Sequence, residues 1–341
     1  MDRKQLISSL AVAGLLVQSS LCSWSKSGSP NDVVMETNFP LAQNQQWAIE
    51  ESYLLWKPYM GNMWYGSKEK FEQTGNNTSD HLKVKNPEFE WSSGVRMGIS
   101  RYLSNHDSWD VNLTGTYFYS TLEDHTDANP SSNLFFNELL TLDPLKLANE
   151  GEFNWRLNYW TLDLCVGRLF KMTPQVVFHP YLGLRGSWQY QKSHLKAEKG
   201  NQVVKGVIDN DFWGVGPRFG THFMYYFENN FSFLANLAGS LLVGGQKIRQ
   251  SNTNTIAPQR TRGHDSSNVI RSNLEGMIGL GWEKWVSNHT VRIAPSVAFE
   301  GSLWFSMNQI YGLSTTINNT GTRRNGNLGL MGVSFDLQID F

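Results

Sequence analysis

The chain has 341 residues, a formal net charge of −1 and 17% charged residues, below the roughly 25% of soluble domains. Without a basic excess to neutralise phosphates, the composition argues against a nucleic-acid-binding protein. Aromatic residues make up 13% and the mean hydropathy is −0.39, which excludes a helical membrane protein but suits strands that face lipid on one side. A large soluble all-β protein would share this composition.

The N-terminus has the parts of a secretory signal peptide. Arg3 and Lys4 are basic, residues 6–17 form a short apolar core, and Cys22 follows small residues. The apolar run is shorter than the ~20 residues that a transmembrane helix needs. We therefore predict a signal peptide over 1–22, export to the periplasm, and a flexible periplasmic leader or lumen segment over 23–47. Cys165 is then the one remaining cysteine, so no intramolecular disulfide is expected.

Ten segments after residue 47 alternate apolar and polar residues with a period of two, which indicates strands with one apolar face. The last is the most regular: Met331, Val333, Phe335, Leu337, Ile339 and Phe341 alternate with small or polar residues. The first is the least regular. In chain order the segments cover 48–58, 94–102, 109–119, 159–170, 176–188, 212–225, 231–244, 273–282, 290–305 and 331–341.

The connections between these segments alternate in length. Short ones lie near 104–107, 172–174, 228–230 and 287–289, and long polar ones cover about 59–88, 121–152, 191–210, 246–268 and 307–326. This alternation is typical of outer-membrane barrels, with short periplasmic turns and long external loops. We therefore predict an all-β fold, a transmembrane antiparallel β-barrel of about ten strands over 48–341. Twelve strands are the alternative if 63–71 and 81–91 pair within the first long loop.

Aromatic residues gather near the ends of the predicted strands, as they do in the girdles at the two membrane interfaces. Ordinary core aromatics of a soluble sandwich are the alternative reading. The girdle candidates are Trp109, Tyr117, Tyr119, Trp188, Tyr225, Trp282, Trp285, Trp304 and Phe305.

Several short stretches, in a fixed order, resemble a known family. They are YLLWKPY, GVRMGISRYLSNHDSWDVNLTGTYFYS, LDLCVGRLF, HPYLGLRGS, GVGPRFGTHF and FSFLANLAGSLLVGG, within about 50–341. The chain resembles the pore-forming outer-membrane proteins typified by the Legionella major outer membrane protein, with relatives in environmental chlamydiae. The resemblance implies a surface-exposed, porin-like barrel. A single mature cysteine departs from major outer-membrane proteins that are cross-linked by disulfides.

Strand parity predicts which polar side chains face the lumen. Asp163, Arg185 and Arg218 lie mid-strand on three successive segments. They could form a charged constriction that filters small polar solutes, or pair across a narrow lumen and brace it shut. The resemblance favours the channel. The pore-lining candidates are Arg96, Asp163, Arg185, Arg218, His222, Glu275, Glu300 and Asp336, and the same parity turns Asp110 and His179 inward.

Other functions have weaker support in the sequence. Acid–histidine pairs in predicted loops, at 80–81, 124–127 and 264–265, would suit a surface protease, but such pairs are usually solvated. We therefore expect no enzymatic activity, no cofactor and no metal. The glycines of GVGPRFG (214–220) lie within a strand, where they permit bending or crowding rather than nucleotide binding. The segment 131–150 has helix-like apolar spacing and could either plug the lumen or cap it outside.

Phe341 ends the closing strand. By family resemblance it is similar to the terminal aromatic residue through which the barrel-assembly machinery recognises its clients. The expected location is the outer membrane, and the expected partners are membrane lipid, the assembly machinery and small polar solutes, with a homo-oligomer or loop contacts to host or envelope as further options. The alternative to a porin-like protein is a non-conducting structural or adhesive barrel that acts through its external loops.

Overall fold

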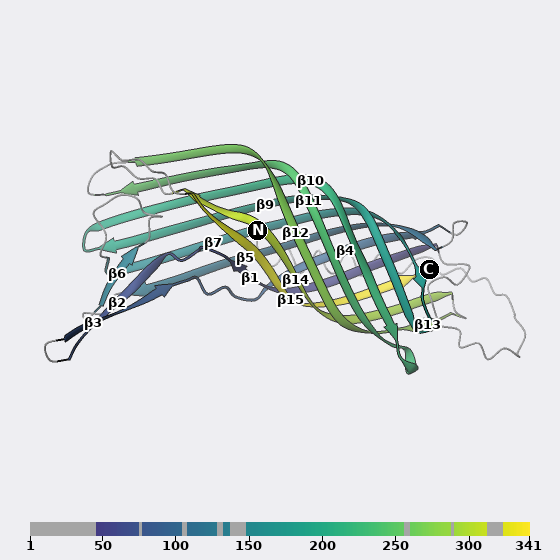
Figure 1. Cartoon of the computed structure of the whole chain (residues 1–341). Coiled ribbons are helices and arrows are strands. Elements are labelled where there is room, and N and C mark those ends of the chain that lie inside the picture. Colours follow the sequence, from purple (N-terminus) through teal and green to yellow (C-terminus); the bar gives the residue numbers. More distant parts are fainter. Residues whose placement is uncertain are drawn as a thin grey trace, which may run out of the picture.

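The computed structural model describes residues 46–74, 77–103, 108–127, 132–136, 148–255, 260–287, 290–311 and 323–341 (Figure 1). The predicted signal peptide over 1–22 and nearly all of the leader over 23–47 lie outside this range, so both stay predictions. No helix within the described residues is long and apolar enough to cross a membrane.

Ten antiparallel strands close into a barrel, which confirms the predicted fold and strand number. Each strand pairs with its neighbour in the chain, and the last pairs with the first from Ala48↔Asp340 to Met60↔Leu328. Short strands β8 (Phe170–Lys171) and β13 (Lys284–Val286) and the 3-10 turn η2 (Glu228–Asn230) lie at the short-turn end. The barrel strands are β1 (Trp47–Met60), β4 (Ser92–Tyr102), β5 (Trp109–Asp127), β7 (Glu150–Arg168), β9 (Val176–Lys199), β10 (Gln202–Tyr226), β11 (Phe231–Asn254), β12 (Arg260–Trp282), β14 (Val291–Tyr311) and β15 (Arg323–Asp340).

A small separate sheet lies beside the barrel at the end with the long connections (Figure 1). It contains β2 (Gly66–Thr74), β3 (Asn77–Lys85) and β6 (Ser132–Phe136), in the order β3-β2-β6. The hairpin considered for the first long loop therefore exists, but it adds no strands to the barrel. The helix-like spacing over 131–150 was misleading for 132–136, which pair as a strand with β2. Residues 137–147 lie outside the described range, so the plug prediction is not tested.

Two connections predicted as long loops are mostly strand. The chain between β9 and β10 turns tightly at Gly200, where φ is +58°, instead of forming a loop over 191–210. Strands β11 and β12 likewise extend to Asn254 and from Arg260, through most of the loop predicted over 246–268. The ladders continue because inward-facing apolar side chains, such as Leu195, Val204 and Ile248, stay buried along these extensions.

The outer surface of the barrel carries an apolar band, and a row of aromatic side chains marks its edge on the side of the long connections. Tyr117, Trp160, Trp188 and Trp213 are successive register partners on β5, β7, β9 and β10, and the Tyr117 and Trp160 ring centroids are 4.2 Å apart. Leucines and valines cover the wall from this row toward the short turns, while lysines and arginines face outward beyond it. This is the arrangement of an interfacial girdle at the edge of the lipid-facing band. Trp304, predicted for a girdle, is instead fully buried inside the barrel.

Glycines allow the backbones of the neighbouring strands β10 and β11 to approach each other closely. A Cβ atom on Gly216 would lie 2.0 Å from the Leu241 carbonyl oxygen, and one on Gly244 would lie 1.8 Å from the Trp213 carbonyl oxygen. No side chain could fit at either position without moving the neighbouring backbone. The strand glycines of 214–220 therefore permit backbone crowding, as their position within a strand predicts.

Candidate functional site

A cavity of about 320 Å³ lies inside the barrel, between the short turns and the middle of the strands. Its walls are built by inward positions of all ten barrel strands, because successive side chains of a strand point to opposite faces. Asp110 and His179 also reach it. The eight predicted pore-lining residues all line this cavity: Arg96, Asp163, Arg185, Arg218, His222, Glu275, Glu300 and Asp336.

Arg185 is the centre of a buried ion network. It lies opposite Asp163 in the β7–β9 register, and its Nε and Nη2 atoms each donate to an Asp163 carboxylate oxygen over 2.6 Å. Arg185 also donates to the Glu275 carboxylate on β12, and over 2.7 Å to Asn273 Oδ1. The residue is only 3% exposed. Bidentate pairing of this kind fixes the guanidinium in one orientation.

Arg218 on β10 completes this network. Its Nη2 atom donates to Glu275 over 2.7 Å, and its Nε atom lies 3.5 Å from Asp163 Oδ2. Two arginines thus face two carboxylates, and the group has no formal charge excess. The Arg218 Nη1 atom is buried and has no hydrogen-bond partner among the described residues. Pairs of this kind offset the cost of dehydrating each charge, but they also brace the walls across the lumen.

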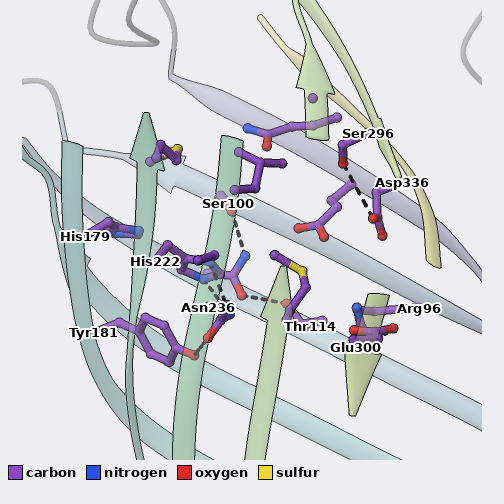
Figure 2. Close-up of a pocket in the computed structure, with 18 of the residues that line it drawn as sticks. Arg96, Ser100, Thr114, His179, Tyr181, His222, Asn236, Ser296, Glu300 and Asp336 are labelled. Atoms are coloured by element: carbon purple, nitrogen blue, oxygen red, sulfur yellow. Dashed lines mark hydrogen bonds and ion pairs between the residues drawn. The ribbon is translucent and has the colours of Figure 1, made fainter. Parts of the chain in front are cut away.

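A second network occupies the wall formed by β1, β4, β14 and β15. Arg96 donates to both Glu300 oxygens over 3.0 and 3.1 Å, and the Trp56 indole donates to Glu300 over 3.0 Å. Asp336 accepts from the Ser334 hydroxyl over 2.9 Å. Figure 2 shows the Arg96–Glu300 pair and Asp336 on one side of the cavity, and the histidines on the other. Glu50 also lines this wall. The sequence did not predict its inward orientation, because the first segment has the least regular alternation.

The histidines form a third group, on β9 and β10. His179 Nε2 lies 2.6 Å from Asp110 Oδ1, and the His179 and His222 rings stack with centroids 5.8 Å apart. Asn236 on β11 contacts His222 through its amide nitrogen and accepts from the Tyr181 hydroxyl over 3.3 Å (Figure 2). The cavity wall is therefore hydrogen-bonded on this side as well.

Five aromatic side chains close the cavity toward the long hairpins, and we call them the aromatic layer. Tyr159 precedes Asp163 on β7 and Phe212 precedes Arg218 on β10, so the layer lies on the hairpin side of the charges. Neighbouring ring centroids are 5.4 to 6.5 Å apart. The aromatic layer consists of Trp56, Phe118, Tyr159, Phe212 and Trp304, each at most 3% exposed. Sequence reasoning missed this layer, although each member is at an inward position of its strand.

Another buried ion group closes the short-turn end. Arg292 on β14 donates through Nε to Asp340 over 2.6 Å and through Nη1 to Glu283 over 2.9 Å. The Tyr102 hydroxyl also donates to Asp340, over 3.1 Å. Sequence reasoning did not single out these residues, because they lie at strand ends where parity is hardest to assign. The described interior is thus a polar compartment with a packed boundary at each end.

The acid–histidine pairs outside the barrel show no catalytic arrangement within the described part of the chain. His125 Nε2 lies 2.7 Å from Asp127 Oδ1, but both side chains are about 60% exposed and face solvent. His264 is on the outward face of β12. The side chains of Asp80 and His81 lie outside the described part of the structure.

Comparisons with known proteins place these observations in a family. A family model described as Legionella pneumophila major outer membrane protein precursor matches residues 39–341. No curated protein sequence gives a significant match.

Solved structures similar to this chain are outer-membrane barrels of low identity. The outer membrane protease OmpT from Escherichia coli is 11% identical with a TM-score of 0.39, over 87% of this chain and 97% of that one. The transport unit of the Escherichia coli autotransporter AIDA-I is 8% identical with a TM-score of 0.29, over 98% and 97%. The Pseudomonas putida toluene transporter TodX is 6% identical with a TM-score of 0.26, over 86% and 89%.

Proposed function

Because the chain belongs to the family of the Legionella pneumophila major outer membrane protein precursor and is an outer-membrane β-barrel, we propose that it is a porin-like protein. In this proposal small polar solutes diffuse passively through its narrow, charged lumen, without enzymatic activity. The observation that carries the proposal is the cavity of about 320 Å³ that lies inside the barrel and is lined by charged and polar side chains. A barrel that served only as a scaffold would gain more stability from packing apolar side chains there.

The same geometry supports a small and restricted pore. The aromatic layer lies between the cavity and the hairpins, and the Arg292 group lies between the cavity and the short turns. A solute must therefore displace side chains at both boundaries, so conduction is expected in small, brief steps. The arginine and carboxylate networks along the path would select solutes by charge.

The test is single-channel conductance of the refolded mature protein in a planar bilayer, after a heat-modifiable gel shift has shown that the barrel is folded. Discrete, reproducible steps are expected. The double variant Arg185→Gln with Arg218→Gln should change ion selectivity, whereas Arg249→Gln, exposed on the outer face of a hairpin, should not. A folded barrel that stays silent would contradict the porin-like function.

A second function is favoured by the aromatic layer and the hairpin extensions. Fully buried aromatic side chains fill the barrel section that a permanent channel would leave open. Strands β9 and β10 continue past the girdle residues Trp188 and Trp213 to a turn at Gly200, and β11 and β12 extend as far as Asn254 and Arg260. Figure 1 shows these strands reaching the end of the molecule with the long connections. A non-conducting barrel that binds host or envelope partners through these extensions would use both features. In that case the Arg185→Gln and Arg218→Gln double variant would lower stability or cause leakage, and removing the hairpin tips would abolish binding to cells.

A further inference from the structure

Two arginines lie on the lipid-facing side of the barrel, at the short-turn ends of their strands. Arg101 is the last residue but one of β4, and Arg168 is the last residue of β7. Each has an outward-facing tryptophan as its register partner, Trp47 for Arg101 and Trp109 for Arg168. The two tryptophans begin β1 and β5 and are more than a third exposed. They mark the second edge of the apolar band, at the opposite end of the strands from the aromatic row on the side of the long connections.

Aromatic rings hold both guanidinium groups in place. The Arg101 guanidinium carbon lies 5.0 Å from the centroid of the Trp47 ring. The Arg168 guanidinium carbon lies over two rings, 5.6 Å from the centroid of Trp109 and 5.1 Å from that of Phe170. A guanidinium that stacks on a ring does so with its flat face, so the N–H groups around its edge can still donate hydrogen bonds. Each arginine is therefore a positioned donor group at the membrane interface.

Neither arginine has a carboxylate partner in the described part of the chain. The arginines that form ion pairs there are Arg96, Arg185, Arg218, Arg249 and Arg292. All of these except Arg249 line the interior cavity, and Arg249 lies beyond the other edge of the band. A cation at the edge of the apolar layer that lacks an acidic neighbour is most stable next to an anion that the membrane supplies.

The two edges of the band differ in charge. Beyond Trp213, basic and acidic side chains are mixed: Arg249 Nη2 lies 2.8 Å from Asp211 Oδ2, and Lys192 Nζ lies 3.6 Å from Asp209 Oδ1. At the short-turn edge, the outward charged side chains at strand ends are all basic in the described structure: Arg101, Arg168 and Lys284. This excess of positive charge favours an anionic partner in the head-group region of the periplasmic leaflet.

Apolar side chains lie next to both arginines on the membrane side. Ile99 is the outward residue before Arg101 on β4, and Val166 is the outward residue before Arg168 on β7. Leu113 on β5 is the register partner of Ile99. The three apolar residues are 41 to 42% exposed, so the wall offers acyl chains an open apolar surface that ends at the guanidinium groups.

We propose that Arg101 and Arg168 each bind the phosphate group of an anionic phospholipid in the periplasmic leaflet. The phosphate oxygens accept hydrogen bonds from the free edge of each guanidinium, and the acyl chains run along Ile99, Leu113 and Val166. A net negative head group is favoured over a zwitterionic one, because an added ammonium group would be repelled by the basic residues of this edge. The site goes beyond axial diffusion of polar solutes, because its ligand is a membrane component and its occupation does not depend on conduction.

The test titrates the refolded protein in a neutral detergent with phosphatidylglycerol, and native mass spectrometry counts the lipids that stay bound. Phosphatidylglycerol should bind in preference to phosphatidylcholine. The double variant Arg101→Gln with Arg168→Gln should lower the affinity for phosphatidylglycerol roughly tenfold or more, since each arginine contributes a hydrogen bond between charged groups. Arg249→Gln is the matched control, because Arg249 is exposed on the outer face but already lies 2.8 Å from Asp211. It should leave the affinity unchanged.

Two further variants test the stacked geometry. Trp109→Leu with Phe170→Leu keeps the charge of Arg168 but removes the rings that position it, and should weaken phosphatidylglycerol binding severalfold. Arg101→Lys with Arg168→Lys keeps both charges but replaces the planar guanidinium, and should also bind more weakly than the parent protein. A heat-modifiable gel shift verifies folding of each variant, and the lysine variant replaces the glutamine variant if the latter does not fold.

Three outcomes would overturn the proposal. Equal binding of phosphatidylglycerol and phosphatidylcholine would show ordinary annular lipid. An affinity of the arginine double variant equal to that of Arg249→Gln would show that Arg101 and Arg168 do not hold the phosphate. Displacement of the lipid by inorganic phosphate at equal concentration would show a site for free phosphate rather than for a lipid. Binding of phosphatidylglycerol by a barrel without conductance would support this site while contradicting the porin-like function.

Discussion

On the short-turn side of the interior, inward positions carry arginines and carboxylates that satisfy one another in networks around a cavity. On the hairpin side, inward positions of the same strands carry aromatic rings that pack without leaving such a space. The alternation of the strands fixes which residues point inward, but it does not determine whether the inside is open or filled. The size and chemistry of the inward side chains at each level of the barrel determine whether the interior is open or filled there. A β-barrel can therefore contain a compartment without being a continuous tube.

The largest loss of stability is expected on the hairpin side of the interior, where the aromatic layer fills the barrel. Trp304→Ala removes a side chain at 0% exposure that contacts Tyr159 and Phe212, and we expect a loss of about 4 kcal/mol in the free energy of unfolding. Trp160→Ala is the control, since Trp160 faces outward and is 49% exposed. Urea unfolding in detergent measures both. Equal losses would show that Trp304 does not belong to a packed interior layer. If the aromatic layer also limits conduction, only Trp304→Ala should enlarge the conductance steps.

A somewhat smaller loss in the free energy of unfolding is expected for a change in the ion networks on the short-turn side of the interior. Asp163→Asn removes the bidentate carboxylate partner of Arg185 and leaves Glu275 as the one carboxylate that pairs with this buried guanidinium among the described residues, at a cost of about 3 kcal/mol. Asp336→Asn neutralises a carboxylate of the same cavity that has no basic group at ion-pair distance among the described residues, so its cost should be much smaller. Unfolding midpoints of the two variants give the comparison. A similar loss in both would mean that the networks do not brace the barrel.

The sequence was sufficient for the fold because lipid on one side forces a period of two over each crossing. The ends of the strands beyond the membrane were harder to predict. Residues 191–210 read as a loop because their outward members, such as Lys192 and Asp209, are charged, yet their inward members Leu195 and Ile208 keep the alternation of a strand. Reading only the inward positions would have found the extensions of β9 and β10.

The site could be predicted as a set of residues but not as a set of contacts. Parity turned Asp163, Arg185 and Arg218 inward, but it could not say that Asp163 faces Arg185 directly, because that depends on the register between β7 and β9. Trp304 shows the opposite case. Trp304 lies on the same side of its strand as Glu300, which was predicted to face the lumen. The alternation therefore predicted that Trp304 faces inward, but its position near a strand end led to the wrong prediction of a girdle residue.

Tyr65, which immediately precedes β2, offers a pH-dependent test at the hairpin end of the barrel, where it is fully buried. The Tyr65 hydroxyl lies 2.7 Å from the Thr126 hydroxyl, and its ring stacks on Phe153 with centroids 5.2 Å apart. Burial raises the pKa of Tyr65 to about 12 from an ordinary value near 10. The neutral phenol is thus the stabilising form. Its contribution is complete below pH 10 and is lost as the pH rises toward 12.

Tyr65→Phe removes both the hydrogen bond and the titration. We expect a loss of about 1 kcal/mol at neutral pH, and a difference from the parent protein that shrinks between pH 10 and 12. Urea unfolding at a series of pH values measures the difference. If it stays constant across that range, Tyr65 does not couple this connection to the barrel through its neutral hydroxyl.

The smallest effect on stability is expected at the C-terminus, where assembly and folding can be separated. Phe341 and Phe335 have the same side chain and the same exposed fraction of 48%, and both face lipid on the closing strand. The Phe341 backbone joins β1 through hydrogen bonds of 2.8 and 3.0 Å with Trp47, which do not depend on its ring. Phe341→Ala and Phe335→Ala should therefore each cost about 1 kcal/mol at most in the refolded barrel. If Phe341 is the assembly signal, only Phe341→Ala should reduce the amount of protein inserted into the outer membrane of cells. Equal insertion of the two variants would show that the terminal ring is one more lipid-facing side chain.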